Sequence, residues 1–155
     1  MNIPKFVETT RLVMVIFAFT IMNSVNNNAV EMLHFLVLWM IVPLAGLTGL
    51  EGMFFSRVTA QSAGRAINNP YQKQSAANNL ALAITALIVW VMNWGVTADA
   101  TIMIATLCFF SISACVHTWE AIKLKNYRLK NLFRPIWTLA LLGVCLPVLI
   151  EALLS

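Results

Sequence analysis

The chain has 155 residues, of which 60% are hydrophobic and 10% are charged, and its formal net charge is +4. A soluble domain carries about a quarter charged residues, so this composition excludes an ordinary soluble protein and indicates a single domain in a membrane. The basic balance does not indicate nucleic-acid binding, because loops beside anionic lipid are themselves basic.

Five apolar stretches follow one another along the chain, and a transmembrane helix needs about 20 such residues. The first is the weakest, because its uninterrupted run extends only from Leu12 to Met22. It can cross a membrane if it runs from about residue 6 to residue 25 with the Arg11 side chain extended to the headgroups, and otherwise it is an interfacial or re-entrant helix. We therefore predict an all-α membrane helical bundle with spans at residues 6–25, 32–50, 77–96, 100–122 and 136–154.

The charges predict the orientation of these spans. With the N-terminus in the cytoplasm, all ten basic residues fall in the inner segments 1–11, 51–77 and 122–135. The outer segments contain none and carry Glu31 and Asp99. Positive charge accumulates on the cytoplasmic side of membrane proteins, so we predict a cytoplasmic N-terminus, an outer C-terminus and an odd number of spans.

Residues 51–76 form the longest predicted cytoplasmic loop. Phe54 and Phe55 precede a small-residue stretch that is typical of a short interfacial helix. A turn is expected at residues 68–71, and Ser75 or Asn78 is expected to cap the next span.

The second span has small residues at positions 45, 46, 49 and 52, which predict close packing against another helix. Pro43 lies in the same span and predicts a kink there.

Counting the helical rise places several polar residues in one layer at the cytoplasmic end. Glu51 lies about 28 Å from the outer edge, while His117 and Glu120 lie about 26 Å and 30 Å from it. Ionisable residues inside a span are costly, and they are therefore functional candidates. The ligand-binding candidates are Glu51, Gln72, Asn78, Asn79, His117, Glu120 and Asn126, and the anion-binding candidates are Arg57 and Arg65.

No metal or cofactor is predicted. His34 lies near the outer edge, close to Glu31, so it cannot share a haem with His117. A metal site from Glu51, His117 and Glu120 is conceivable, but helical di-metal sites repeat a Glu-x-x-His pattern on two helices. Here a single pair occurs, in the reverse order.

Several short motifs resemble an uncharacterised bacterial family of small membrane proteins. They cover roughly residues 50–140, although Val116 replaces a glycine before the histidine and Leu139 stands where the family often has an aspartate. The motifs are Asn-Pro-Tyr-Gln at 69–72, Asn79-Leu80-Ala81, His117-x-x-Glu120, Asn126-Tyr127, Asn131 and Trp137-Thr138. The resemblance implies one cytoplasmic-side constellation made of Gln72, Asn79, His117, Glu120 and Asn126.

A looser resemblance is to the small membrane-bound glutathione and eicosanoid transferases. Arg65-Ala66 and Gln72 stand in step with a motif at a span entrance of those proteins, but the proline that usually follows is missing. That resemblance implies four spans and a trimer.

Three functions remain open. The favoured one is a binding or transport module whose cytoplasmic-side polar pocket holds a small ligand, an ion or a lipid headgroup. The alternatives are a membrane enzyme that uses His117 and Glu120 as an acid–base pair, and an accessory subunit of a larger membrane complex. In each case we expect a multi-pass protein of the bacterial inner membrane, in contact with lipid and able to form a homo-oligomer, with no nucleic-acid partner.

Overall fold

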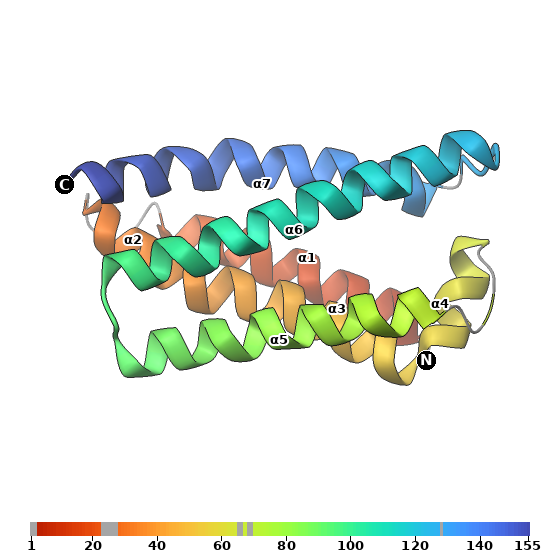
Figure 1. Cartoon of the computed structure of the whole chain (residues 1–155), viewed down its shortest axis with the longest axis horizontal. Helices are drawn as coiled ribbons and strands as arrows, with labels where there is room; N and C mark the ends of the chain where they lie inside the picture. Colours follow the sequence, from red (N-terminus) through yellow and green to blue (C-terminus); the bar gives the residue numbers. More distant parts are fainter. Residues whose placement is uncertain (1–2, 23–27, 65–66, 68–69, 128) are drawn as a thin grey trace.

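The apolar runs fold as helices, because a helix satisfies its own backbone hydrogen bonds where lipid offers no partner. A computed structural model describes residues 3–22, 28–64, 67, 70–127 and 129–155. Within these residues the chain forms helices joined by turns, without strands. The helices lie roughly along one common axis (Figure 1). They are α1 (Ile3–Met22), α2 (Ala29–Leu36), η1 (Val37–Ile41), α3 (Val42–Phe54), α4 (Ser56–Ala63), α5 (Pro70–Met92), α6 (Val96–Lys123) and α7 (Leu129–Leu154).

Four helical stretches in the described residues are long and apolar enough to cross a membrane. The first is the continuous helix formed by α2, η1 and α3. The fifth predicted span, α1, has 20 residues but carries Lys5, Glu8 and Arg11 among them, so its crossing of a membrane stays a prediction. The four stretches are Ala29–Phe54, Pro70–Met92, Val96–Lys123 and Phe133–Leu154.

The two ends of the bundle differ in the segments that they gather. The N-terminus, α4 and the connection between α6 and α7 lie at one end, and the C-terminus and the start of α2 lie at the other (Figure 1). The first end collects the segments that carry the basic residues. We call it the basic end.

One predicted helix boundary is wrong. Helix α5 begins at Pro70, so Ser75 and Asn78 lie inside the helix and do not cap it. Proline suits a first helical position, because its missing N–H is one that the helix leaves unpaired anyway. The short helix expected after Phe55 is present as α4, and it ends at Gly64 in a left-handed conformation (φ 67°).

Pro43 disturbs the central helix without ending it. Proline cannot donate the backbone hydrogen bond of a regular α-helical turn. The preceding turn, Val37–Ile41, is π-helical, and α3 continues directly from it. The kink expected at Pro43 therefore takes the form of a π-helical turn inside one long helix.

The small residues of α3 lie against α5. A Cβ added at Gly49 would stand 2.6 Å from Leu80 Cγ, and one added at Gly52 would stand 2.6 Å from Ala76 Cβ. Both distances are shorter than real Cβ contacts, so the two backbones approach each other only because these positions lack a side chain.

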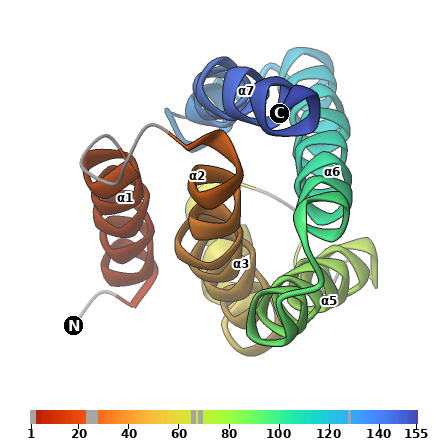
Figure 2. The same cartoon turned by 90° about the vertical axis from the view of Figure 1, so that its left-hand side faces the viewer.

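The helix formed by α2, η1 and α3 lies at the centre, with α1 on one side and α5, α6 and α7 on the other (Figure 2). Leu36, Met40 and Ile41 of this helix are fully buried, as is Met103 of α6. Helix α1 packs on the central helix, where the rings of Phe17 and Trp39 meet edge to face at 5.6 Å.

Candidate functional site

A cavity of about 420 Å³ lies inside the bundle, toward the basic end. Its volume falls within the usual range of small-molecule pockets, about 300–1,000 Å³. Apolar side chains form most of its wall, and each of α1, α3, α5, α6 and α7 contributes polar side chains to it. The lining residues are Glu8, Thr9, Arg11, Leu12 and Val15 of α1; Leu44, Thr48 and Glu51 of α3; Thr59 of α4; Ser75 and Asn79 of α5; Phe109, Phe110, Ser113, Ala114 and His117 of α6; and Asn131, Phe133, Arg134, Trp137, Thr138 and Leu141 of α7.

An ion pair joins α1 to α3 at the wall of this cavity. Arg11 Nη2 donates to Glu51 Oε2 at 2.6 Å, and Arg11 Nη1 donates to Thr48 Oγ1 at 3.0 Å. Only 7% of the Glu51 side chain is exposed. The expectation that Arg11 extends to the headgroups is therefore wrong, because a buried carboxylate lies within its reach and compensates its charge.

Thr59 of α4 adds a second contact to the same carboxylate. Its Oγ1 lies 3.4 Å from Glu51 Oε1 and 3.0 Å from the Phe55 carbonyl oxygen, so its single proton can reach either acceptor. Glu51 Oε2 accepts the shorter bond, from Arg11. The short helix α4 covers this part of the site.

Asn79 is a cavity-lining residue whose side-chain oxygen has no hydrogen-bond partner. The residue is 3% exposed, and its Nδ2 donates to the Ser75 carbonyl at 2.8 Å. Only the nitrogen of the Asn79 side-chain amide can donate to a carbonyl, so the atom without a partner is the amide oxygen. Asn79 Oδ1 and Arg11 Nε are buried without a hydrogen-bond partner. A buried amide oxygen and a buried guanidinium N–H without partners cost free energy, so each atom offers a ligand a favourable hydrogen bond.

His117 lines the cavity from α6, whereas Glu120 does not. His117 Nδ1 lies 3.6 Å from Glu120 Oε2, and 49% of the Glu120 side chain is exposed. The two residues share a helix face, as the i, i+3 spacing predicts. Glu120 contacts the histidine from outside the cavity and can orient it there.

The other predicted site residues lie elsewhere. Asn78 is exposed, and Arg57 is exposed on α4. Gln72 Nε2 donates to the Ser56 carbonyl at 3.3 Å, and Asn126 Nδ2 donates to the Gly64 carbonyl at 3.1 Å. Those two side chains contact the backbone at the two ends of α4 instead of lining the cavity. Arg65 lies outside the described residues.

Three of the lining residues, Glu51, Asn79 and His117, were among the predicted site residues. Those that were not include Glu8 and Arg11 of α1, and Asn131, Arg134 and Trp137 of α7. The two arginines had been counted among the basic charges of the inner segments. Asn131 and Trp137 belong to the motifs of the family resemblance, and that was the signal that could have identified them.

A second buried polar pair lies toward the opposite end of the bundle. His34 Nδ1 and Asp99 Oδ2 are 2.8 Å apart, and Asp99 is 2% exposed. The Trp90 ring stacks on His34 with centroids 6.0 Å apart. His34 was expected near Glu31, but α6 begins at Val96 and carries Asp99 into the helix bundle.

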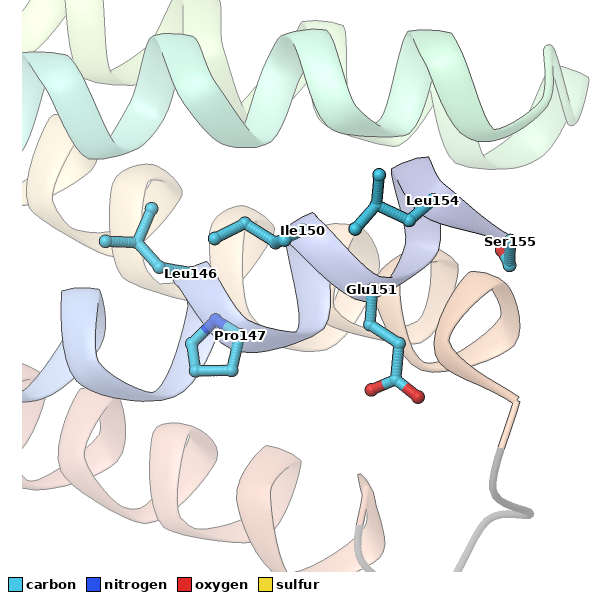
Figure 3. A pocket seen from close by; sticks show the side chains of 6 residues that line it. All are labelled: Leu146, Pro147, Ile150, Glu151, Leu154 and Ser155. Carbon is cyan, nitrogen blue, oxygen red and sulfur yellow. The ribbon is translucent and has the colours of Figure 1, made fainter.

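A hollow of about 640 Å³ lies along α7 near the C-terminus (Figure 3). This one helix supplies all of its lining, Leu146, Pro147, Ile150, Glu151, Leu154 and Ser155. Glu151 points away from the side on which Ile150 and Leu154 lie (Figure 3). A surface lined by a single helix cannot enclose a ligand, so we do not treat it as a site.

Among the described residues, no group of three His, Cys, Asp or Glu side chains could hold a metal ion. The comparisons with curated proteins and with solved structures found no match. A family model described as a family of unknown function, DUF6790, matches residues 1–154, and the chain therefore belongs to that family.

Proposed function

We propose that this protein is a membrane-embedded binding protein that holds a small ligand in the cavity between α1, α3, α5, α6 and α7. The observation that carries the proposal is that two residues lining one cavity, Asn79 and Arg11, each hold a buried polar atom without a hydrogen-bond partner, Asn79 Oδ1 and Arg11 Nε. An unpaired acceptor and an unpaired donor beside an apolar wall are the features of a ligand pocket. Glu51 and His117 complete its polar part.

The ligand is held toward the cytoplasm. The basic residues favour a cytoplasmic location for the basic end of the bundle, because lysine and arginine accumulate on that side. The cavity lies toward the same end, as the helical rise had predicted for Glu51 and His117. The bacterial inner membrane remains the expected location.

An apolar layer separates the cavity from the opposite end. Leu36, Met40 and Met103 are fully buried, and along their helices they lie between the cavity and the His34–Asp99 pair. A continuous polar path would be needed for conduction. This layer favours binding from one side over passage through the bundle in the conformation described.

The direct test compares two neighbouring asparagines of α5. Asn79→Leu removes the cavity amide, whereas Asn78→Leu changes an exposed residue. We expect protein purified in mild detergent to carry a small molecule that denaturation releases and mass spectrometry detects. Asn79→Leu should lose this molecule and Asn78→Leu should retain it. An equal content in folded Asn79→Leu would refute the proposal.

A further inference from the structure

The exposed lining residues mark the opening of the cavity. The lining residues of α3, α4, α5 and α6 are all buried or half-buried. The exposed ones are confined to α1, with Glu8, Thr9 and Leu12, and to α7, with Phe133 and Trp137. The mouth of the cavity therefore lies between α1 and α7.

The arrangement of the helices agrees with a mouth at this place. Helix α1 packs on the central helix, and α7 packs on α6 and α2. Viewed along the bundle, α1 stands apart from α7 (Figure 2).

Three of the five exposed side chains at the mouth are large and apolar, and the other two are Glu8 and Thr9. Leu12 is 39% exposed, Trp137 is 41% exposed and Phe133 is 48% exposed, and all three line the cavity. They belong to helices whose outer surface is apolar, where Val13 and Ile136 are also exposed. A tryptophan near a span end is typical of the boundary between hydrocarbon and headgroups. The apolar part of this mouth suits a molecule that comes from the bilayer.

The interior of the cavity matches an amphipathic molecule. Phe109, Phe110 and Leu141 form an apolar wall, and Arg11 and Asn79, each with a buried polar atom that lacks a partner, belong to the polar part. A head group that both donates and accepts hydrogen bonds would satisfy both atoms.

The charges of the lining predict the charge of the head group. Two arginines, Arg11 and Arg134, stand against two glutamates, Glu8 and Glu51. Arg11 and Glu51 already neutralise each other. The formal charges of these four residues therefore sum to zero. They would not compensate a net charge on a buried head group, and burying an uncompensated charge is costly.

Resting on the binding function proposed above, we propose that the ligand is a single-chain amphiphile with an uncharged, hydroxyl-bearing head group. It reaches the cavity sideways from the bilayer, between α1 and α7. Its head group donates to Asn79 Oδ1 and accepts from Arg11 Nε. Its chain lies along Phe109 and Phe110 and leaves through the mouth beside Leu12 and Trp137.

The experiment uses the full chain in phosphatidylcholine nanodiscs. The probe is a monoacylglycerol with a photoactivatable group in its chain, and mass spectrometry maps the residues that it labels. We expect saturable labelling of α1 and α7 around the mouth. Unlabelled monododecanoylglycerol should compete for this labelling, and glycerol should not compete.

Two variants with matched chemistry test the route. Leu12→Trp obstructs the mouth, and Val13→Trp places the same side chain on the neighbouring lipid-facing position, which does not line the cavity. We expect the first to weaken labelling by about tenfold, the equivalent of ~1.4 kcal/mol, and the second to leave it unchanged. If Leu12→Trp fails to fold, Phe133→Trp obstructs the mouth from α7.

The remaining outcomes separate the two proposals. An Asn79-dependent small molecule that co-purifies while monododecanoylglycerol does not compete would preserve the binding function and overturn the amphiphile. If glycerol competes as well as monododecanoylglycerol does, the amphiphile proposal is overturned and the binding function is preserved. Stronger competition by dodecanoate or by dodecyltrimethylammonium would overturn the uncharged head group. The absence of both saturable labelling and a co-purified molecule would overturn both proposals.

Discussion

Gly49 lies so close to Ala76 that a Cβ at position 49 would stand 2.9 Å from the Ala76 carbonyl oxygen. A carbonyl of a helix backbone cannot move aside as a flexible side chain can. The contact between α3 and α5 therefore holds the cavity residues Glu51 and Asn79 on two helices of fixed separation.

Gly49→Ala is expected to destabilise the bundle. The added methyl group overpacks the contact between the helices, at a cost of about 1–3 kcal/mol. Gly46→Ala is the matched control, because its Cβ would meet Ala83 Cβ at an ordinary 3.5 Å. We expect Gly46→Ala to be neutral or slightly stabilising, since alanine favours a helix over glycine by about 0.5–1 kcal/mol. Thermal unfolding in detergent, followed by circular dichroism, measures both changes, and equal Tm values for the two variants would contradict the contact.

Arg11 and Glu51 are expected to be coupled in a double-mutant cycle. Arg11→Met leaves a buried carboxylate without its partner, and breaking a buried pair costs about 3–5 kcal/mol. The double variant Arg11→Met/Glu51→Leu should recover much of the lost unfolding free energy, because neither charge of the buried pair remains. Arg57→Met provides the control, since Arg57 is exposed on α4. Additive losses in unfolding free energy would show that the two residues do not act as a pair.

His117→Ala and Glu120→Gln are expected to differ in their effect on the bound molecule. His117 lines the cavity, and Glu120 contacts the histidine from outside. We expect the first variant to lose most of the co-purified molecule and the second to retain most of it. If Glu120→Gln loses more of the bound molecule than His117→Ala does, the site lies on the face of α6 that points away from the cavity.

A reporter fused after Ser155 is expected to read as lying on the outer side of the membrane. A reporter inserted beside Lys73 should read as cytoplasmic, and one inserted at Asn93, in the turn between α5 and α6, should read as outer. These readings follow from an odd number of crossings with the basic end inside. A cytoplasmic reading after Ser155 would remove α1 from the spans or reverse the orientation.

The fold was predictable to the extent that hydropathy and helical rise determine it. The all-helical membrane fold and the membership of an uncharacterised family are confirmed. Depth along a helix follows from counting residues, which is why Glu51, Asn79 and His117 fall on one cavity.

The direction in which a side chain points was harder to predict. Gln72 and Asn126 lie at the expected end but contact backbone carbonyls at the two ends of α4, and Glu120 faces outward. Arg11 and Arg134 had been interpreted as charges that face the cytoplasm. Their places in the cavity depend on how α1 and α7 rotate about their axes, and a single sequence with weak amphipathic patterns does not determine that rotation.

The bond between Arg11 and Glu51 has a consequence for biosynthesis. Helix α1 is made first, yet the carboxylate that neutralises its arginine lies 40 residues later in the chain. Until α3 has been synthesised, α1 carries an uncompensated charge that opposes its transfer into hydrocarbon. We therefore expect the contact of α1 with Glu51 to form only after α3 has been synthesised, so that α1 joins the bundle later than its place in the chain suggests.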